Sequence, residues 1–327
     1  MSDSGACATR PPSPRIWQPR RVQEGSKKAI IAAFFANLGI AAAKLVGFLI
    51  TRSAGMLAEA GHSLADTGNQ GLLLFGSKRS KRPADLAHPF GYGPERYFWS
   101  FVVALVLFSM GGLFALYEGI EKLRHPHQID SAAIAFVILG IAIVLETFSL
   151  RTAVHEARHV KPKDKGWWWF IRNAKSPELP IVLLEDTGAE VGLLFAFLGL
   201  LFAEITDDPR WDAVGSVAIG ILLVVVAAIL AIEMKGLLIG ESATEEVRRA
   251  LTDAIETAPS VNSLIHLRTM HLAPEQLLVA AKIEYDRSLS IDELAPAVDA
   301  TEVKLRAAVP YDLMIYIEPD IRRAVTP

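Results

Sequence analysis

The chain has 327 residues, a formal net charge of −3 at pH 7, and a composition of 51% hydrophobic against 21% charged residues. A nearly balanced charge argues against a nucleic-acid partner, which requires a strongly basic face. The sole cysteine, Cys7, excludes an internal disulfide and a cysteine-based zinc cluster. Any metal ion is therefore expected to be held by His, Asp and Glu.

The first 27 residues lack the apolar core of a signal peptide, and Asp3 and Glu24 argue against a transit peptide. We interpret residues 1–27 as a flexible cytoplasmic tail.

Long apolar segments follow this tail. A helix needs about 20 apolar residues to cross hydrocarbon about 30 Å thick. Such segments occur at about 28–50, 54–77, 97–120, 131–153, 180–204 and 212–238. The chain is therefore predicted to be an integral multi-pass membrane protein in which residues 28–240 form an all-α bundle of six transmembrane helices.

Basic residues concentrate in two of the connections between these segments. They are Lys78, Arg79, Lys81, Arg82 and Arg96 after the second segment, and Arg158, Lys161, Lys163, Lys165, Arg172 and Lys175 after the fourth. Positively charged loops stay in the cytoplasm, so both termini are predicted to be cytoplasmic. In a bacterium the membrane would be the inner, or plasma, membrane.

The pattern changes at residue 241 to that of a small soluble domain. Ser242 and Glu245 have the spacing of a helix capping box, and strand-like alternation follows at about 264–270 and 277–285. A second helix is expected from about Ser290, and a last strand around Ile315. Residues 241–327 are thus predicted to form a cytoplasmic α+β domain, an open-faced sandwich of the ferredoxin or metallochaperone-like type.

The second apolar segment contains Glu59, His62 and Asp66. Ionisable groups at membrane depth are costly unless they face a cavity or a partner, so they mark candidate functional sites. His62 and Asp66 lie four residues apart and share one helix face, and imidazole with carboxylate suits zinc or a neighbouring first-row metal. A hydrogen-bonded helix contact without metal is the alternative.

The fifth segment contains Glu185, Asp186 and Glu190. By span count this helix runs antiparallel to the second. At 1.5 Å per residue, Asp66 lies about 16 Å from the cytoplasmic end of its helix, Asp186 about 9 Å and Glu190 about 15 Å. These carboxylates are therefore expected to meet Asp66 near the middle of the membrane.

Three motifs, AEAGHSLAD (58–66), HPFGYGPERY (88–97) and LEDTGAEVG (184–192), resemble the cation diffusion facilitator family of proton-coupled zinc and manganese exporters. Within that family the resemblance is to the zinc transporter 9 subgroup. It implies a homodimer that moves a divalent cation through the lipid bilayer by alternating access, in exchange for protons and without a cofactor. It also implies that His62, Asp66 and Asp186 are metal ligands.

The fourth ligand position of the family is Val182 here, which cannot coordinate a metal. The coordination shell of the metal ion is expected to be completed by Glu190, by Glu185 or by water. An oxygen-rich shell weakens the preference for zinc. Zinc efflux remains the prediction, with manganese or iron(II) export by the same site as the alternative.

A competing motif is HEARH at 155–159, which fits the HExxH pattern of zinc metalloproteases. A membrane metalloprotease is therefore an alternative of another class, although the motif lies at the end of a span among basic residues. A metal sensor or scaffold without transport is a third class. His266 and His271 of the C-terminal domain are expected to be solvated surface residues.

Overall fold

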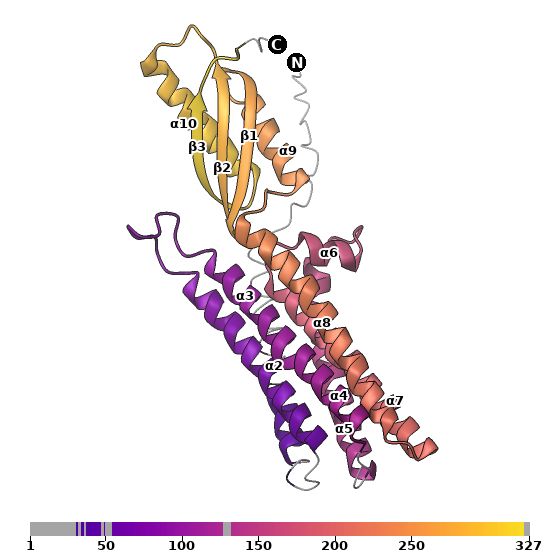
Figure 1. Cartoon of the computed structure of the whole chain (residues 1–327). Coiled ribbons are helices and arrows are strands. Elements are labelled where there is room, and N and C mark those ends of the chain that lie inside the picture. Colours follow the sequence, from indigo (N-terminus) through magenta and orange to yellow (C-terminus); the bar gives the residue numbers. More distant parts are fainter. Residues whose placement is uncertain are drawn as a thin grey trace, which may run out of the picture.

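The computed structural model describes residues 31, 34, 35, 37–46, 49, 54–126 and 132–323, and the side chains of 54–62 lie outside this description. The tail predicted for residues 1–27 also lies outside it. A bundle of long helices forms one end of the molecule and a small α+β domain forms the other (Figure 1). This architecture confirms the predicted fold class.

Residues 37–46 are helical. The helices that follow are α2 (Ala54–Arg79), α3 (Glu95–Val106), the π-helical segment η1 (Leu107–Leu113), α4 (Phe114–Arg124), α5 (Ala132–Val160), the short α6 (Trp167–Asn173), α7 (Glu178–Thr206) and α8 (Arg210–Ile239). The segments α3, η1 and α4 form one continuous helix, Glu95–Arg124. Together with α5, α7 and α8 it gives four helices, among the described residues, that are long and apolar enough to cross a membrane.

Small residues allow α4 and α8 to pack closely. A Cβ atom added to Gly119 would lie 2.7 Å from Val217 Cγ2, and one added to Gly220 would lie 2.7 Å from the backbone nitrogen of Leu116. Small residues at such crossings let helix backbones approach within a membrane. A larger side chain at either glycine would push these helices apart.

The C-terminal domain contains α9 (Glu245–Glu256), β1 (Val261–Ala273), β2 (Gln276–Tyr285), α10 (Ile291–Ala308) and β3 (Asp312–Pro319). The strand order is β1-β2-β3, with β1 antiparallel and β3 parallel to β2. The two helices cover one face of the sheet (Figure 1). Alternate residues of β2 from Leu277 to Tyr285 are buried against them, so the predicted order of elements is confirmed.

A capping box between Ser290 and Glu293 starts α10. The box predicted at Ser242 is wrong, because α9 begins at Glu245 with Thr244 as its N-cap residue. Ser242 instead lies beside β1, where its hydroxyl is 2.9 Å from that of Thr269. The segment between α8 and α9 therefore packs along the sheet before the helix starts.

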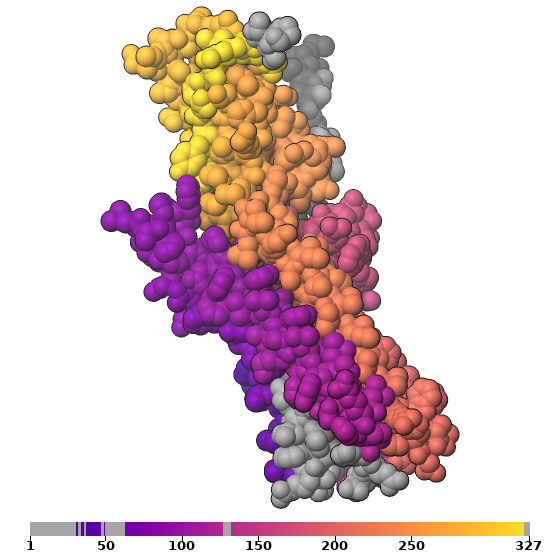
Figure 2. Space-filling view, viewed as in Figure 1, coloured from indigo at the N-terminus to yellow at the C-terminus, as the bar shows by residue number. Residues whose placement is uncertain are grey.

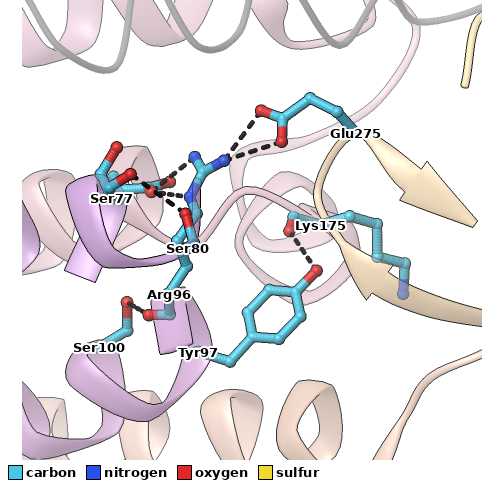
Figure 3. Close-up of polar contacts among 8 residues, drawn as sticks. Ser77, Ser80, Arg96, Tyr97, Ser100, Lys175 and Glu275 are labelled. Atoms are coloured by element: carbon cyan, nitrogen blue, oxygen red, sulfur yellow. Dashed lines mark hydrogen bonds and ion pairs between the residues drawn. The ribbon is translucent and has the colours of Figure 1, made fainter. Parts of the chain in front are cut away.

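A buried arginine joins the bundle to the C-terminal domain (Figure 3). Arg96 is 3% exposed. Its Nη1 donates to both carboxylate oxygens of Glu275, at 2.8 and 3.0 Å, and its Nε donates to Glu178 Oε1 at 2.6 Å. Beside it, Tyr97 Oη donates to the carbonyl of Lys175. Helices α3 and α7 and the β1–β2 turn thus meet at one side chain, where the two parts of the molecule are in contact (Figure 2).

Candidate metal site

The polar face of α2 points into the bundle. Asp66 is 4% exposed, and Ser63, Asn69 and Gln70 are also buried. The backbone of His62 lies in the same helix four residues before Asp66, while its side chain lies outside the described part of the chain. Of the predicted ligands on this helix, Asp66 is therefore placed inside the bundle, and the position of the His62 imidazole stays a prediction.

Glu185 of α7 is held by two amide donors from α2. Asn69 Nδ2 donates to Glu185 Oε1 and Gln70 Nε2 donates to Glu185 Oε2, both at 2.8 Å. Both carboxyl oxygens of Glu185 are thus engaged. This arrangement favours a role for Glu185 in joining α2 to α7 over direct metal binding.

Asp186 is 1% exposed and accepts a hydrogen bond from Ser149 Oγ of α5 at 2.8 Å. One turn further along α7, Glu190 Oε1 accepts a hydrogen bond from Thr147 Oγ1 at 2.9 Å. Val182 is fully buried among apolar side chains and offers no ligand atom. Of the α7 residues named from the sequence, Asp186 and Glu190 therefore both face α5.

A small cavity of about 20 Å³ lies between these helices. Its lining includes Lys44, Ser63, Asp66, Glu146 and Gly188. A single water molecule needs roughly 10–15 Å³, so the cavity can hold one water or one unhydrated cation. Lys44 Nζ donates a hydrogen bond to Ser63 Oγ at 2.9 Å.

Sequence reasoning missed the amide pair Asn69 and Gln70 and gave no weight to Glu146. The sequence signal for Asn69 and Gln70 was the presence of two adjacent amide side chains in an apolar helix. For Glu146, the signal was the spacing of Glu146 and Ser149, three residues apart on one face of α5.

The family described as Cation efflux transmembrane domain matches residues 30–239. The chain belongs to the cation efflux family. The resemblance to cation diffusion facilitators is thereby confirmed. This also confirms the prediction that the chain belongs to a family of transporters rather than of enzymes.

Three relatives show the range of this family. Proton-coupled zinc antiporter SLC30A9, mitochondrial, from Homo sapiens is 32% identical over 80% of this chain and 46% of its own length. Metal tolerance protein C4 from Arabidopsis thaliana is 26% identical over 85% of this chain and 62% of its own. Magnetosome protein MamB from Magnetospira sp. (strain QH-2) is 24% identical, with 88% and 93% covered. The chain thus spans about half the length of SLC30A9.

Membership of the cation efflux family removes the support for a metalloprotease at residues 155–159. His155 and His159 lie on the exposed end of α5, and the ring of His159 donates from Nδ1 to the carbonyl of His155. Among the described residues, no group of three His, Cys, Asp or Glu side chains includes this pair. The motif is consistent with a chance match on a solvated helix face.

Replacing Glu156 by glutamine is expected to leave metal flux within about twofold of wild type, because surface substitutions of this kind change stability by about 0.5 kcal/mol or less. Flux and casein cleavage are measured on the same preparation. Casein cleavage by the wild-type protein that disappears in the variant would contradict this reading of the motif.

The expectation for the C-terminal histidines is correct for His266, which is exposed, and wrong for His271, which is 3% exposed. His271 packs edge-on against Tyr311, with ring centroids 5.5 Å apart. Neither ring nitrogen makes a hydrogen bond within the described part of the chain, although the Ala273 backbone is close enough to favour the protonated ring slightly. Burial, and then the nearby ammonium of Lys175, lower the pKa of His271 to about 4.

This histidine predicts an acid-sensitive fold. An unfolded His has a pKa of about 6.5, so the unfolded state takes up a proton that the folded state refuses as the pH falls from 6.5 toward 4. The contribution of neutral His271 to the free energy of unfolding is fully present above pH 6.5. About 3 kcal/mol of it is lost as the pH falls from 6.5 to 4. Thermal unfolding of the full chain in detergent between pH 7 and 4 measures the effect. His271→Phe should flatten the dependence, and an equal slope in both proteins would contradict the assignment.

Proposed function

We propose that the chain exchanges a divalent metal cation for protons across a membrane, with zinc as the expected cargo. The supporting observation is that buried carboxylates on two antiparallel helices face the bundle interior. Helix α2 ends and α7 begins beside the C-terminal domain, because Arg79 pairs with Glu95 and Arg96 pairs with Glu178 at that end (Figure 1). Asp66 and Asp186 therefore lie in the bundle interior on helices that run in opposite directions, and we propose that they bind one cation.

The proposed ligands are His62, Asp66 and Asp186. Imidazole with carboxylates suits zinc, while additional oxygen ligands suit manganese or iron(II). Because Val182 replaces a ligand, the shell is rich in oxygen, and manganese or iron(II) export is the alternative. The zinc assignment draws support from the relative named as a proton-coupled zinc antiporter.

Proton coupling follows from the chemistry of the ligands. Imidazole and carboxylates bind metal only when deprotonated, so protons and metal compete for the same side chains. In alternating access, the cation enters from one side and leaves on the other as protons replace it. His62 is the proposed coupling group, because the ordinary pKa of imidazole, about 6.5, lies near physiological pH.

Charge distribution supports a cytoplasmic C-terminal domain. The connections that follow α2 and α5 carry most of the basic loop residues and lie at the end of the bundle that meets this domain (Figure 1). Because positive loops remain in the cytoplasm, we place residues 1–27 and 241–327 on that side and residues 28–240 in the bilayer. Assembly as a homodimer is part of the proposal by analogy with the family.

A comparison of uptake between metals tests which cation is transported. Proteoliposomes containing the full chain are given zinc, manganese or iron(II) under an imposed pH gradient, and uptake is compared with that of protein-free vesicles. Zinc uptake exceeding that of the other two metals is the expected result. Manganese or iron(II) uptake that exceeds zinc uptake would favour the alternative cargo, whereas metal binding without any uptake would favour a sensor or scaffold.

A further inference from the structure

Glu146 is a buried glutamate in the middle of the apolar helix α5. It is 3% exposed, and its Oε2 atom has no hydrogen-bond partner within the described part of the chain. A carboxylate at membrane depth is costly unless it meets a cation or a polar cavity, and a buried oxygen without a partner carries a further penalty. The position of this side chain therefore requires an explanation.

The surroundings of Glu146 are those of the proposed metal site. Glu146 lines the 20 Å³ cavity together with Asp66 and Lys44. On the same face of α5, Ser149 holds Asp186 through a hydrogen bond, and the charges of Asp186 and Asp66 both act on Glu146. One face of α5 thus reaches both carboxylates that are proposed to bind the cation.

The other carboxylates suit the missing ligand position less well. Both oxygens of Glu185 accept amide hydrogen bonds from α2. Glu190 accepts a hydrogen bond from Thr147 at one oxygen, and its other oxygen, like Oε2 of Glu146, has no partner within the described part of the chain, but Glu190 does not line the cavity that contains Asp66. Glu146 therefore combines an oxygen without a partner with direct access to that cavity.

The formal charges of the cavity favour a cation. With both carboxyl groups deprotonated, as metal binding requires, Asp66 and Glu146 contribute one negative charge each against the one positive charge of Lys44. In a low-dielectric interior an excess negative charge strongly attracts a positive ion. The size of the cavity, about that of one water molecule, suits a cation that has lost most of its hydration shell.

We infer that Glu146 is a ligand of the transported cation and supplies the carboxylate that Val182 cannot. Lys44 is its counter-charge when no cation is bound. This inference rests on the proposed function, since it assigns a further residue to the same site. It makes α5 the third helix that contributes a ligand. Because the described residues contain no preformed group of three His, Cys, Asp or Glu ligands, cation binding is expected to draw the carboxylates of Asp66, Asp186 and Glu146 together.

The first test is zinc binding to the purified full chain, measured by titration calorimetry. Removing even an outer partner of a metal ligand typically costs 10–100-fold in affinity, so Glu146→Gln is expected to weaken zinc binding by more than about tenfold. Glu118→Gln is the matched control: Glu118 also lies in an apolar span, but it pairs with Lys122 and does not line the cavity. It should bind zinc as wild type does, and unchanged affinity in Glu146→Gln would overturn the inference.

A second variant tests whether Glu146 is a metal ligand or only a counter-ion of Lys44. If Glu146 only balances that ammonium, the neutral double variant Lys44→Met with Glu146→Gln should recover wild-type affinity. A ligand cannot be replaced in this way, so the double variant is expected to remain at least about tenfold weaker. Full recovery would overturn the inference. Failure of the proposed function is a distinct outcome, in which the wild-type protein binds no zinc or Asp66→Ala binds it normally.

Discussion

Asp66→Ala is expected to reduce zinc flux into proteoliposomes by more than about 100-fold. Loss of an outer partner of a ligand already costs 10–100-fold in metal affinity, and Asp66 is proposed to bind the cation directly. Its carboxylate is buried and lines the cavity between α2 and α5. Without it, the remaining site has less negative charge and one oxygen ligand fewer, so both binding and transport should be lost.

The matched control is Glu204→Ala. Glu204 is exposed at the far end of α7, away from the cavity, and its loss should leave flux within about twofold of wild type. Asp186→Ala is expected to match Asp66→Ala. Gradient-dependent flux that survives in both aspartate variants would show that the cation is bound elsewhere.

Arg96→Leu is expected to have the second largest effect, on folding. Removing one partner of a buried ion pair leaves an uncompensated buried charge and costs about 3–5 kcal/mol. Arg96 and Glu178 are both almost fully buried, and the same guanidinium holds Glu275 (Figure 3). The variant should lower the thermal unfolding midpoint of the full chain in detergent and reduce its yield.

A surface pair provides the comparison. Arg172 and Glu233 form an ion pair in which the arginine side chain is 57% exposed, and such exposed pairs contribute about 1 kcal/mol or less. Arg172→Ala should therefore shift the midpoint much less. Equal shifts in the two variants would show that the Arg96 cluster is not a main connection between the bundle and the C-terminal domain.

The parts of the fold that were predicted from sequence are those that local patterns specify. Alternation in β2 identified the buried face of the sheet, and the apolar segments identified the long helices. The start of α9 was missed because the capping-box spacing at Ser242 is a local signal, and packing of this segment against β1 overrides it. His271 was misplaced for a related reason, since its burial depends on Tyr311, which is distant in the sequence.

The candidate metal site, too, could be predicted from the sequence only in part. The spacing of His62 and Asp66 can be read along one helix, and Asp186 was named through the resemblance to a family. The partners of Glu185 could not be predicted, because the approach of Asn69 and Gln70 depends on how α2 and α7 are rotated against each other. A single glutamate in an apolar helix, such as Glu146, likewise does not reveal which neighbouring helix it faces.

The central claim is coupled movement of metal and protons through the bundle. It is tested most directly by measuring zinc and protons together in proteoliposomes that contain the wild-type chain. The expected result is that zinc enters as protons leave, that an imposed pH gradient drives uptake, and that collapsing the gradient stops it. Zinc binding to the protein without any zinc flux, or zinc flux that ignores the gradient, would contradict this account.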